Sequence, residues 1–166
     1  MKKMVSKAAF AVALALALGA GTASAEVTVN YVNMEQFADL PSGDWERKDV
    51  LNKLADYIKK LGEDLPAGTD LTVNIYNVDL AGREYPGQRA SGDMRVLEGK
   101  SDWPLIELQY ALSSKGQVFD SGTAQISDVG YMNRKVKMSM EMDNLRYEKR
   151  MLQDWFKKTI LTKKPG

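Results

Sequence analysis

The hydrophobic positions of residues 26–80 change period twice, which predicts a strand, a helix and a second strand. In EVTVNYVN (26–33) apolar and polar residues alternate, the period of a half-buried strand. After the break PSGD, Asp44 is expected to cap a helix, and Gly62 is expected to end it in a left-handed conformation. One face of this helix is apolar through residues at three- and four-residue spacing: Val50, Leu54, Tyr57, Ile58 and Leu61.

DLTVNIYNVDL (70–80) predicts the next strand, and its apolar phase slips by one residue after Ile75, which indicates a bulge. A strand, a helix and a strand in succession favour a crossover unit whose two strands are neighbours and parallel. Residues 81–101 contain four Gly and one Pro, so we expect a long loop, with a short strand at Met94 to Leu97. WPLIELQYAL and QVFDSGTAQIS, joined by SSKG, predict a β-hairpin with a positive φ at Gly116.

LRYEKRMLQDWF (145–156) predicts a helix that closes the core. Burial stabilises each large apolar side chain by roughly 1.5 to 3 kcal/mol, so docking of the stripe should dominate. The fold predicted for residues 26–166 is one α+β domain, a mostly antiparallel sheet of four to five strands with two helices on one face. The apolar stripe comprises Leu145, Leu152, Trp155, Phe156, Thr159 and Ile160; a neighbouring ridge, expected to face solvent, comprises Arg146, Arg150, Gln153 and Lys157.

Glu148 falls inside this apolar stripe. A buried carboxylate must be paired or protonated, so we expect a structural ion pair or a position at the edge of the stripe. A catalytic carboxylate is the alternative, because perturbed acids also occur in active sites.

The first 25 residues have the pattern of a cleaved secretory signal peptide. Lys2, Lys3 and Lys7 precede a 13-residue apolar run (8–20), and Ala-Ser-Ala at 23–25 matches the cleavage pattern. The run is shorter than the roughly 20 residues of a membrane-spanning helix, which disfavours an uncleaved anchor. We therefore expect a protein that begins at Glu26, lies in the periplasm or is secreted, and has no membrane span after cleavage. The chain has no Cys, so it forms no disulfide and carries no lipid-modified cysteine.

Charge is unevenly distributed along the chain. Residues 26–133 hold 10 Lys and Arg against 18 Asp and Glu, whereas residues 134–166 hold 10 against 4. The near-neutral total argues against nonspecific nucleic-acid binding. The basic segment either docks on the acidic body or faces an anionic partner, and docking within the domain is the more common arrangement.

Five stretches together resemble the bacterial family known as domain of unknown function 3016: NVDLAG, MRVL, DWPLIELQYAL, ISD and LRYEKRMLQDW. The resemblance extends from Val27 to about Phe156, and the last stretch is the most specific. It implies an exported bacterial domain and no established activity. Met34 and Asn77 depart from the family pattern, in which we expect a proline and an acidic residue. The motif residues in this chain are Asp79, Leu80, Ala81, Gly82, Tyr147, Glu148 and Trp155.

The composition excludes several chemistries. Without His or Cys, the chain has no Ser-His-Asp or Cys-His catalysis and no usual zinc site. It also lacks the glycine-rich motifs that cradle phosphate groups, and we expect no cofactor. A hydrolase that uses two carboxylates stays an alternative, with four candidate acids: Asp79, Asp102, Asp128 and Glu148.

Methionines supply a second alternative. If KVKMSMEMDN is extended, Met138, Met140 and Met142 share one face, and thioethers select Cu(I); Met is also an ordinary core residue. The favoured function is a non-catalytic envelope protein that binds another envelope protein or an anionic ligand. Its predicted contact surface combines the 81–101 loop with the basic ridge Arg146, Arg150 and Lys157, and Trp103 near Arg95 is a candidate stacking surface.

Overall fold

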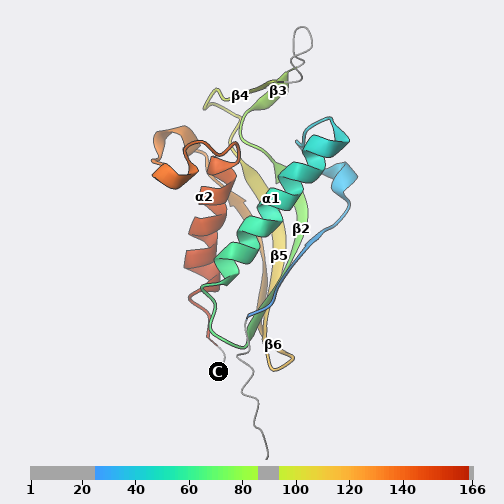
Figure 1. The fold of residues 1–166 in the computed structure, drawn as a ribbon, viewed down its shortest axis with the longest axis vertical. Helices are drawn as coiled ribbons and strands as arrows, with labels where there is room; N and C mark the ends of the chain where they lie inside the picture. Colours follow the sequence, from blue (N-terminus) through green and yellow to red (C-terminus); the bar gives the residue numbers. More distant parts are fainter. Residues whose placement is uncertain (1–24, 86–93, 165–166) are drawn as a thin grey trace, which may run out of the picture.

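The computed structural model describes residues 25–85 and 94–164. Two long helices, α1 (Asp44–Gly62) and α2 (Arg146–Trp155), lie across one face of a four-stranded sheet (Figure 1). The predicted α+β class is therefore confirmed. The predicted signal peptide falls almost entirely on residues 1–24, which lie outside the described ranges. Within those ranges, no helix combines the length and the apolar character that a membrane crossing requires.

The sheet has the order β1-β2-β5-β6. The chain enters on β1 (Val27–Tyr31), crosses through α1 and returns on β2 (Thr69–Asp79) as a parallel neighbour, as predicted. The antiparallel hairpin of β5 (Leu105–Ser114) and β6 (Gln117–Ser127) completes the sheet. The predicted bulge in β2 is also present, because the register shifts between Ile75 and Asn77.

Between β2 and β5, the chain forms a second, two-stranded sheet of β3 (Arg83–Tyr85) and β4 (Met94–Val96). This ribbon projects beyond the end of the main sheet (Figure 1). The predicted 81–101 loop therefore contains two antiparallel strands, and β4 matches the short strand predicted at Met94 to Leu97. Residues 86–93, which complete that loop, lie outside the described ranges.

The remaining elements are short. In residues 25–85 and 94–164, three 3-10 turns occur: Met34–Gln36 (η1), Tyr131–Asn133 (η2) and Met138–Met140 (η3). After α2 the helix widens into a π-turn, η4 (Phe156–Ile160).

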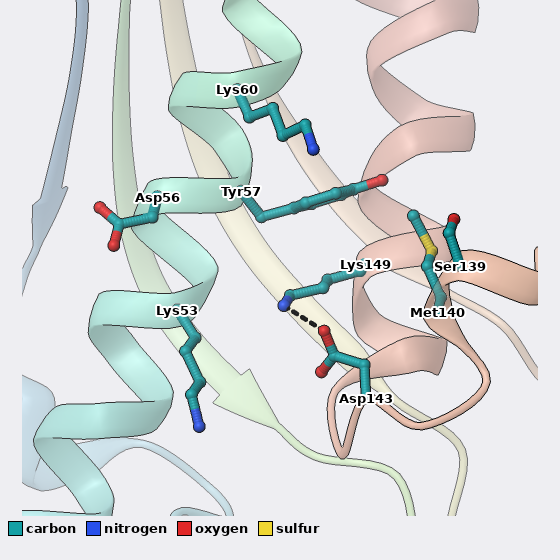
Figure 2. Close-up of a pocket in the computed structure, with 8 residues that line it drawn as sticks. All are labelled: Lys53, Asp56, Tyr57, Lys60, Ser139, Met140, Asp143 and Lys149. Atoms are coloured by element: carbon teal, nitrogen blue, oxygen red, sulfur yellow. Dashed lines mark hydrogen bonds and ion pairs between the residues drawn. The ribbon is translucent and has the colours of Figure 1, made fainter.

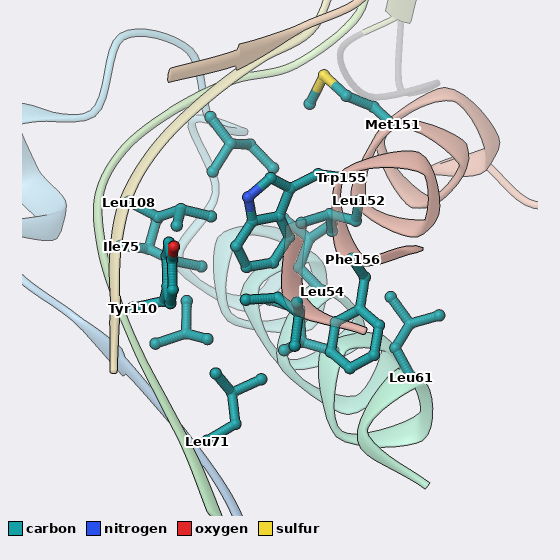
Figure 3. Packing of buried hydrophobic residues seen from close by; sticks show 14 of the residues in the cluster. Leu54, Leu61, Leu71, Ile75, Leu108, Tyr110, Met151, Leu152, Trp155 and Phe156 are labelled. Carbon is teal, nitrogen blue, oxygen red and sulfur yellow. The ribbon is translucent and has the colours of Figure 1, made fainter. Parts of the chain in front are cut away.

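The core lies between the helices and the sheet. The predicted apolar stripe is confirmed, since Leu152, Phe156 and Ile160 are at most 1% exposed and Trp155 is 6% exposed. Figure 3 shows Trp155 and Leu152 directed from α2 toward the sheet, with Leu54 of α1 beside them. The tip of the β5–β6 hairpin has positive φ at Lys115 (52°) as well as at the predicted Gly116 (76°), as its two-residue turn requires.

Two predictions about α1 are wrong. Gly43, not Asp44, occupies the N-cap position, and it makes no side-chain cap. Asp44 is the first helical residue, where its negative charge still stabilises the helix by a favourable interaction with the helix dipole. Gly62 does not terminate the helix with a positive φ; it is a buried helical residue, and a Cβ there would lie 2.1 Å from Cγ2 of Val27. The glycine lets α1 approach β1 closely.

This close approach predicts that Gly62→Ala destabilises the protein by about 1 to 3 kcal/mol through overpacking, although alanine is the better helix former. Thermal unfolding of four proteins measures it: wild type, Gly62→Ala, Val27→Ala and the double variant. The cost of Gly62→Ala should be smaller in the Val27→Ala background, because the clashing methyl group is gone. Equal costs in both backgrounds would contradict the packing explanation.

Candidate functional site

Glu148 connects α2 to the end of β2. Its side chain is 1% exposed, and its Oε1 accepts a hydrogen bond from the backbone N–H of Ala81 at 2.7 Å. The expected structural ion pair is absent among the described residues, because this partner is a backbone amide. The next residue, Gly82, has a φ of +85°, a conformation that favours glycine. A Cβ at this position would lie 2.4 Å from the Val96 carbonyl oxygen, so the close approach also requires glycine. Two motif segments, DLAG and RYE, are thus in direct contact.

The environment of Glu148 favours its neutral form. Burial raises the pKa of Glu148, and the Ala81 hydrogen bond and the charges of Arg95 and Arg146 offset this only in part. Its Oε2 is buried and has no hydrogen-bond partner within the described ranges. The arrangement accounts for Glu148 as a structural link between α2 and the sheet.

Arg150 is not on an exposed ridge. It is 7% exposed, and its guanidinium donates to Asp128 Oδ2 and to the Tyr131 carbonyl, both at 2.7 Å. It also donates to the Arg134 carbonyl at 2.5 Å. The prediction that Arg150 faces solvent is therefore wrong: the residue holds the 128–134 segment against α2.

Other predicted binding residues also make internal contacts. Arg95 pairs with Asp39 at 2.7 Å, and Trp103 is half-buried. Arg146 lies over the ring of Tyr147, 4.6 Å from its centroid. Of the three ridge cations Arg146, Arg150 and Lys157, only Lys157 is exposed. Because Arg150 is buried and three others are partly buried, the five predicted binding residues do not form one exposed surface.

The four candidate acids have separate partners. Asp79 pairs with Arg83 at 3.2 Å, and Asp128 pairs with Arg134 and Arg150. Asp102 accepts from the backbone of Glu98 and Lys100 and from the Tyr131 hydroxyl. Burial raises the pKa of Asp102, but these hydrogen bonds lower it by more, so the pKa lies below its ordinary value. Structural contacts thus account for each acid.

The methionine segment is not extended. Met138 to Met140 form the 3-10 turn η3, so the condition for three methionines on one face is not met. Met138 and Met142 are 86% and 96% exposed, whereas Met140 is half-buried. In the described part of the chain, no group of three or more Asp or Glu side chains is arranged to hold a metal ion.

A pocket of about 330 Å³ lies between α1 and the η3–α2 segment. In Figure 2, Tyr57 extends from α1 toward α2, with Lys60 and Lys149 drawn on either side of its ring. We call this space the helix pocket. Its lining residues are Lys53, Asp56, Tyr57, Lys60, Ser139, Met140, Asp143 and Lys149.

The three lysines of the helix pocket differ in their pairing. Lys149 donates to Asp143 at 2.5 Å, and its ammonium lies 5.6 Å from the centre of the Tyr57 ring. Lys53 pairs with Asp49, also at 2.5 Å. Lys60, by contrast, has no ion-pair partner in ranges 25–85 and 94–164 and is exposed.

Tyr57 contributes an unusual polar group. Its hydroxyl is buried and has no hydrogen-bond partner among the described residues. Burial, with the negative charges of Asp143 and Asp154, raises the pKa of Tyr57 to about 12, so the hydroxyl stays protonated at neutral pH. Asp143 is itself ionised, because Lys149 and the Leu145 N–H lower its pKa more than burial raises it.

The hydrophobic pattern of the sequence did not predict this pocket. Tyr57 was assigned to the apolar face of α1, so the spacing of the lysines around it was not considered. Lys53 and Lys60 lie four residues before and three residues after Tyr57, so all three fall on one side of the helix. The contribution of Lys149 depends on how α2 packs, which this spacing does not reveal.

Comparison with known proteins supports the resemblance found in the motifs. The family model described as Protein of unknown function (DUF3016) matches residues 25–158. The chain belongs to this family. The match covers β1 through most of η4, including both contacting motif segments. Neither a curated protein nor a solved structure matches the chain.

The Glu148 contact predicts a stability difference between two substitutions. Glu148→Leu leaves the buried Ala81 N–H unpaired, which should cost about 1 to 3 kcal/mol. Glu148→Gln retains an acceptor oxygen and should cost less. Chemical denaturation of both variants measures the difference, and equal stability of wild type and Glu148→Leu would contradict it.

The same contact predicts a pH dependence. Because the folded-state pKa of Glu148 is raised above its ordinary value of 4.5, ionisation destabilises the folded state. The wild type should lose stability relative to Glu148→Gln as the pH rises from 4.5 through the raised pKa, and the difference should then level off. A difference independent of pH would contradict this electrostatic account.

Proposed function

We propose that this chain is a non-catalytic binding protein of the bacterial envelope and that it binds a small anionic ligand in the helix pocket. The observation that carries the proposal is a pocket lined by Lys53, Lys60 and Lys149, in which Lys60 and Lys149 lie on either side of Tyr57, whose buried hydroxyl has no hydrogen-bond partner among the described residues. Ammonium groups are strong donors to carboxylate and phosphate oxygens.

The charge balance of the pocket favours an anion. Its lining contains three Lys and two Asp side chains. Asp143 is already neutralised by Lys149, and Asp56 lies 4.0 Å from Lys59, which is outside the lining. Lys60 therefore supplies a positive charge that no lining carboxylate balances.

The pocket also has the size and composition of a small-molecule site. Its volume of about 330 Å³ is within the range of roughly 300 to 1,000 Å³ typical of ligand pockets. The Tyr57 ring and Met140 provide apolar surface, and the Ser139 hydroxyl provides a further hydrogen-bonding group. Such a mixture suits a ligand with an anionic group and a less polar portion.

A binding role without catalysis fits the residues available. The helix pocket contains Lys, Asp, Tyr, Ser and Met, and the chain has no His or Cys to serve as a base or nucleophile. Of its two acids, Asp143 is fixed as an ionised partner of Lys149, and Asp56 is exposed. A carboxylate hydrolase would need one acid free to donate a proton and a second placed across the substrate bond.

The envelope assignment rests on the N-terminal sequence. The lysines, the apolar run and the Ala-Ser-Ala pattern are the features that export machinery and signal peptidase recognise.

Anion binding should depend on Lys60. We predict that inorganic phosphate, pyrophosphate or citrate binds the purified protein and that Lys60→Glu weakens the tightest of these at least about tenfold, which is about 1.4 kcal/mol. Isothermal titration calorimetry measures the affinity, with uncharged glycerol as the ligand control. Rising salt concentration should weaken the binding, because it screens the lysine charges.

Lys48→Glu provides the matched control variant. Lys48 is an exposed lysine of α1 that does not line the pocket and has no ion-pair partner among the described residues. The two variants have the same net charge, so a general electrostatic effect would weaken binding equally in both. Equal loss in both variants, or no binding of any of the three anions, would contradict the proposed site.

Export predicts a defined mature protein. When the full-length chain is expressed in a Gram-negative bacterium, the protein released from the periplasm should begin at Glu26. Intact mass measurement and N-terminal sequencing check this directly. A chain that retains residues 1–25, or that stays in the cytoplasm, would contradict the envelope assignment.

A further inference from the structure

β6 forms an open edge of the sheet. It pairs with β5 on one side, and no other described segment makes backbone hydrogen bonds to its opposite side. A strand at such an edge presents a row of unpaired N–H and C=O groups that can pair with another chain. Because β6 spans 11 residues, this row is long enough to pair with several residues of a peptide.

From Asp120 to Ser127, the β6 edge lacks common protective features. Natural edge strands are often protected by lysine, proline or a bulge. β6 has no Lys and no Pro, and its one charged side chain, Asp120, is already bound by Lys163 and the Tyr110 hydroxyl. Its register is irregular only near the hairpin tip, where Leu112 pairs with Asp120 and Ser113 with Val118. The stretch from Asp120 to Ser127 is therefore regular and open to pairing.

A groove follows the last part of this edge. It has a volume of about 300 Å³ and lies between β6 residues 125–127 and the α2–η4 segment. Ile126, Met151 and Trp155 give it an apolar surface, and Lys158 and Thr159 line its η4 side. We call it the edge groove. It is separate from the helix pocket, since the two share no lining residue.

We propose that the edge groove binds an extended peptide, which adds to the sheet as a strand beside β6. Every second side chain of an added strand faces the same side, so an apolar side chain of the peptide can contact Ile126, Met151 and Trp155 while backbone groups pair with β6. A carboxylate two residues away along the peptide, or at its end, then faces Lys158.

The charges around the groove determine the preferred peptide. Arg134 is already bound to Asp128 and Asp154, whereas Lys158 has no ion-pair partner within the described residues. Lys158 is exposed, and it lies beside the apolar surface. The occupant is therefore a peptide that combines an apolar side chain with a nearby acidic group.

Trp155 provides a further hydrogen-bonding group. It lines the groove, and its indole N–H is buried without an acceptor in ranges 25–85 and 94–164. A buried unpaired donor costs stability, so an acceptor brought by the peptide would relieve that cost after a small side-chain movement. A row of unpaired backbone groups beside an apolar groove favours a polypeptide over a compact small molecule.

The test is selection of ten-residue peptides from a random phage-displayed library on the immobilised protein, followed by synthesis of the enriched peptides. We expect enriched sequences with alternating apolar positions and an acidic residue. Amide hydrogen exchange should show that a bound peptide protects the backbone of β6. Lys158→Glu should weaken binding at least tenfold, whereas Lys157→Glu, a change at an exposed neighbour that does not line the groove, should not.

Three outcomes would overturn the proposal. The first is a selection that enriches no peptide. The second is peptide binding that leaves β6 exchange unchanged and is equally strong in Lys158→Glu. The third is a free protein that is dimeric, with β6 amides already protected, because the occupant of the edge would then be a second copy. The Lys60→Glu variant should bind the peptide normally, so failure of the anion site and failure of the edge groove are distinguishable.

Discussion

The docking of α2 against the sheet is the interaction on which the rest of the structure depends. The chain has no Cys, so apolar burial has to hold its last helix in place without a disulfide. Leu152, Trp155 and Phe156 supply that burial, at roughly 1.5 to 3 kcal/mol for each side chain. The ring of Trp155 packs edge-on against Tyr110 of β5, with 6.0 Å between centroids.

This docking determines where the polar residues of the helix lie. Glu148 is brought to the Ala81 N–H, and Lys149 is brought to the helix pocket on the side of α1. On the opposite side, α2 and β6 form the edge groove. After Trp155, the wider π-turn of η4 keeps Phe156 and Ile160 buried while Lys157 and Lys158 face solvent. Such π-turns often mark functional positions in helices, and this one ends beside the groove.

The sequence was sufficient to predict the elements that depend on local periodicity. The parallel pair β1 and β2, the β2 bulge and the β5–β6 hairpin all follow from apolar spacing and glycine turns. The position of Gly62 was misinterpreted, because a glycine required for a close approach to Val27 looks the same in sequence as one that ends a helix. Local spacing carries no information about which strand a helix face contacts.

The candidate site was less predictable for the same reason. The helical spacing of Arg150 places it beside the apolar stripe, but its burial depends on Asp128 and the Tyr131 carbonyl, about 20 residues earlier. Glu148 was correctly expected to be buried, whereas its backbone partner was not foreseen, since any residue supplies an N–H. The helix pocket combines residues of α1 and α2 that are more than 80 positions apart, so only the folded structure reveals it.

The central claim is that the docking of α2 beside α1 creates a specific anion site. The most direct measurement is a two-dimensional ¹H–¹⁵N NMR titration of the purified protein with inorganic phosphate. Our account predicts saturable shifts concentrated at residues 53–60 and 139–149, with residues 125–127 of the edge groove unchanged. Small, unsaturable shifts spread over surface lysines throughout the chain would contradict it, because they would mean that phosphate samples the general positive charge and not a pocket.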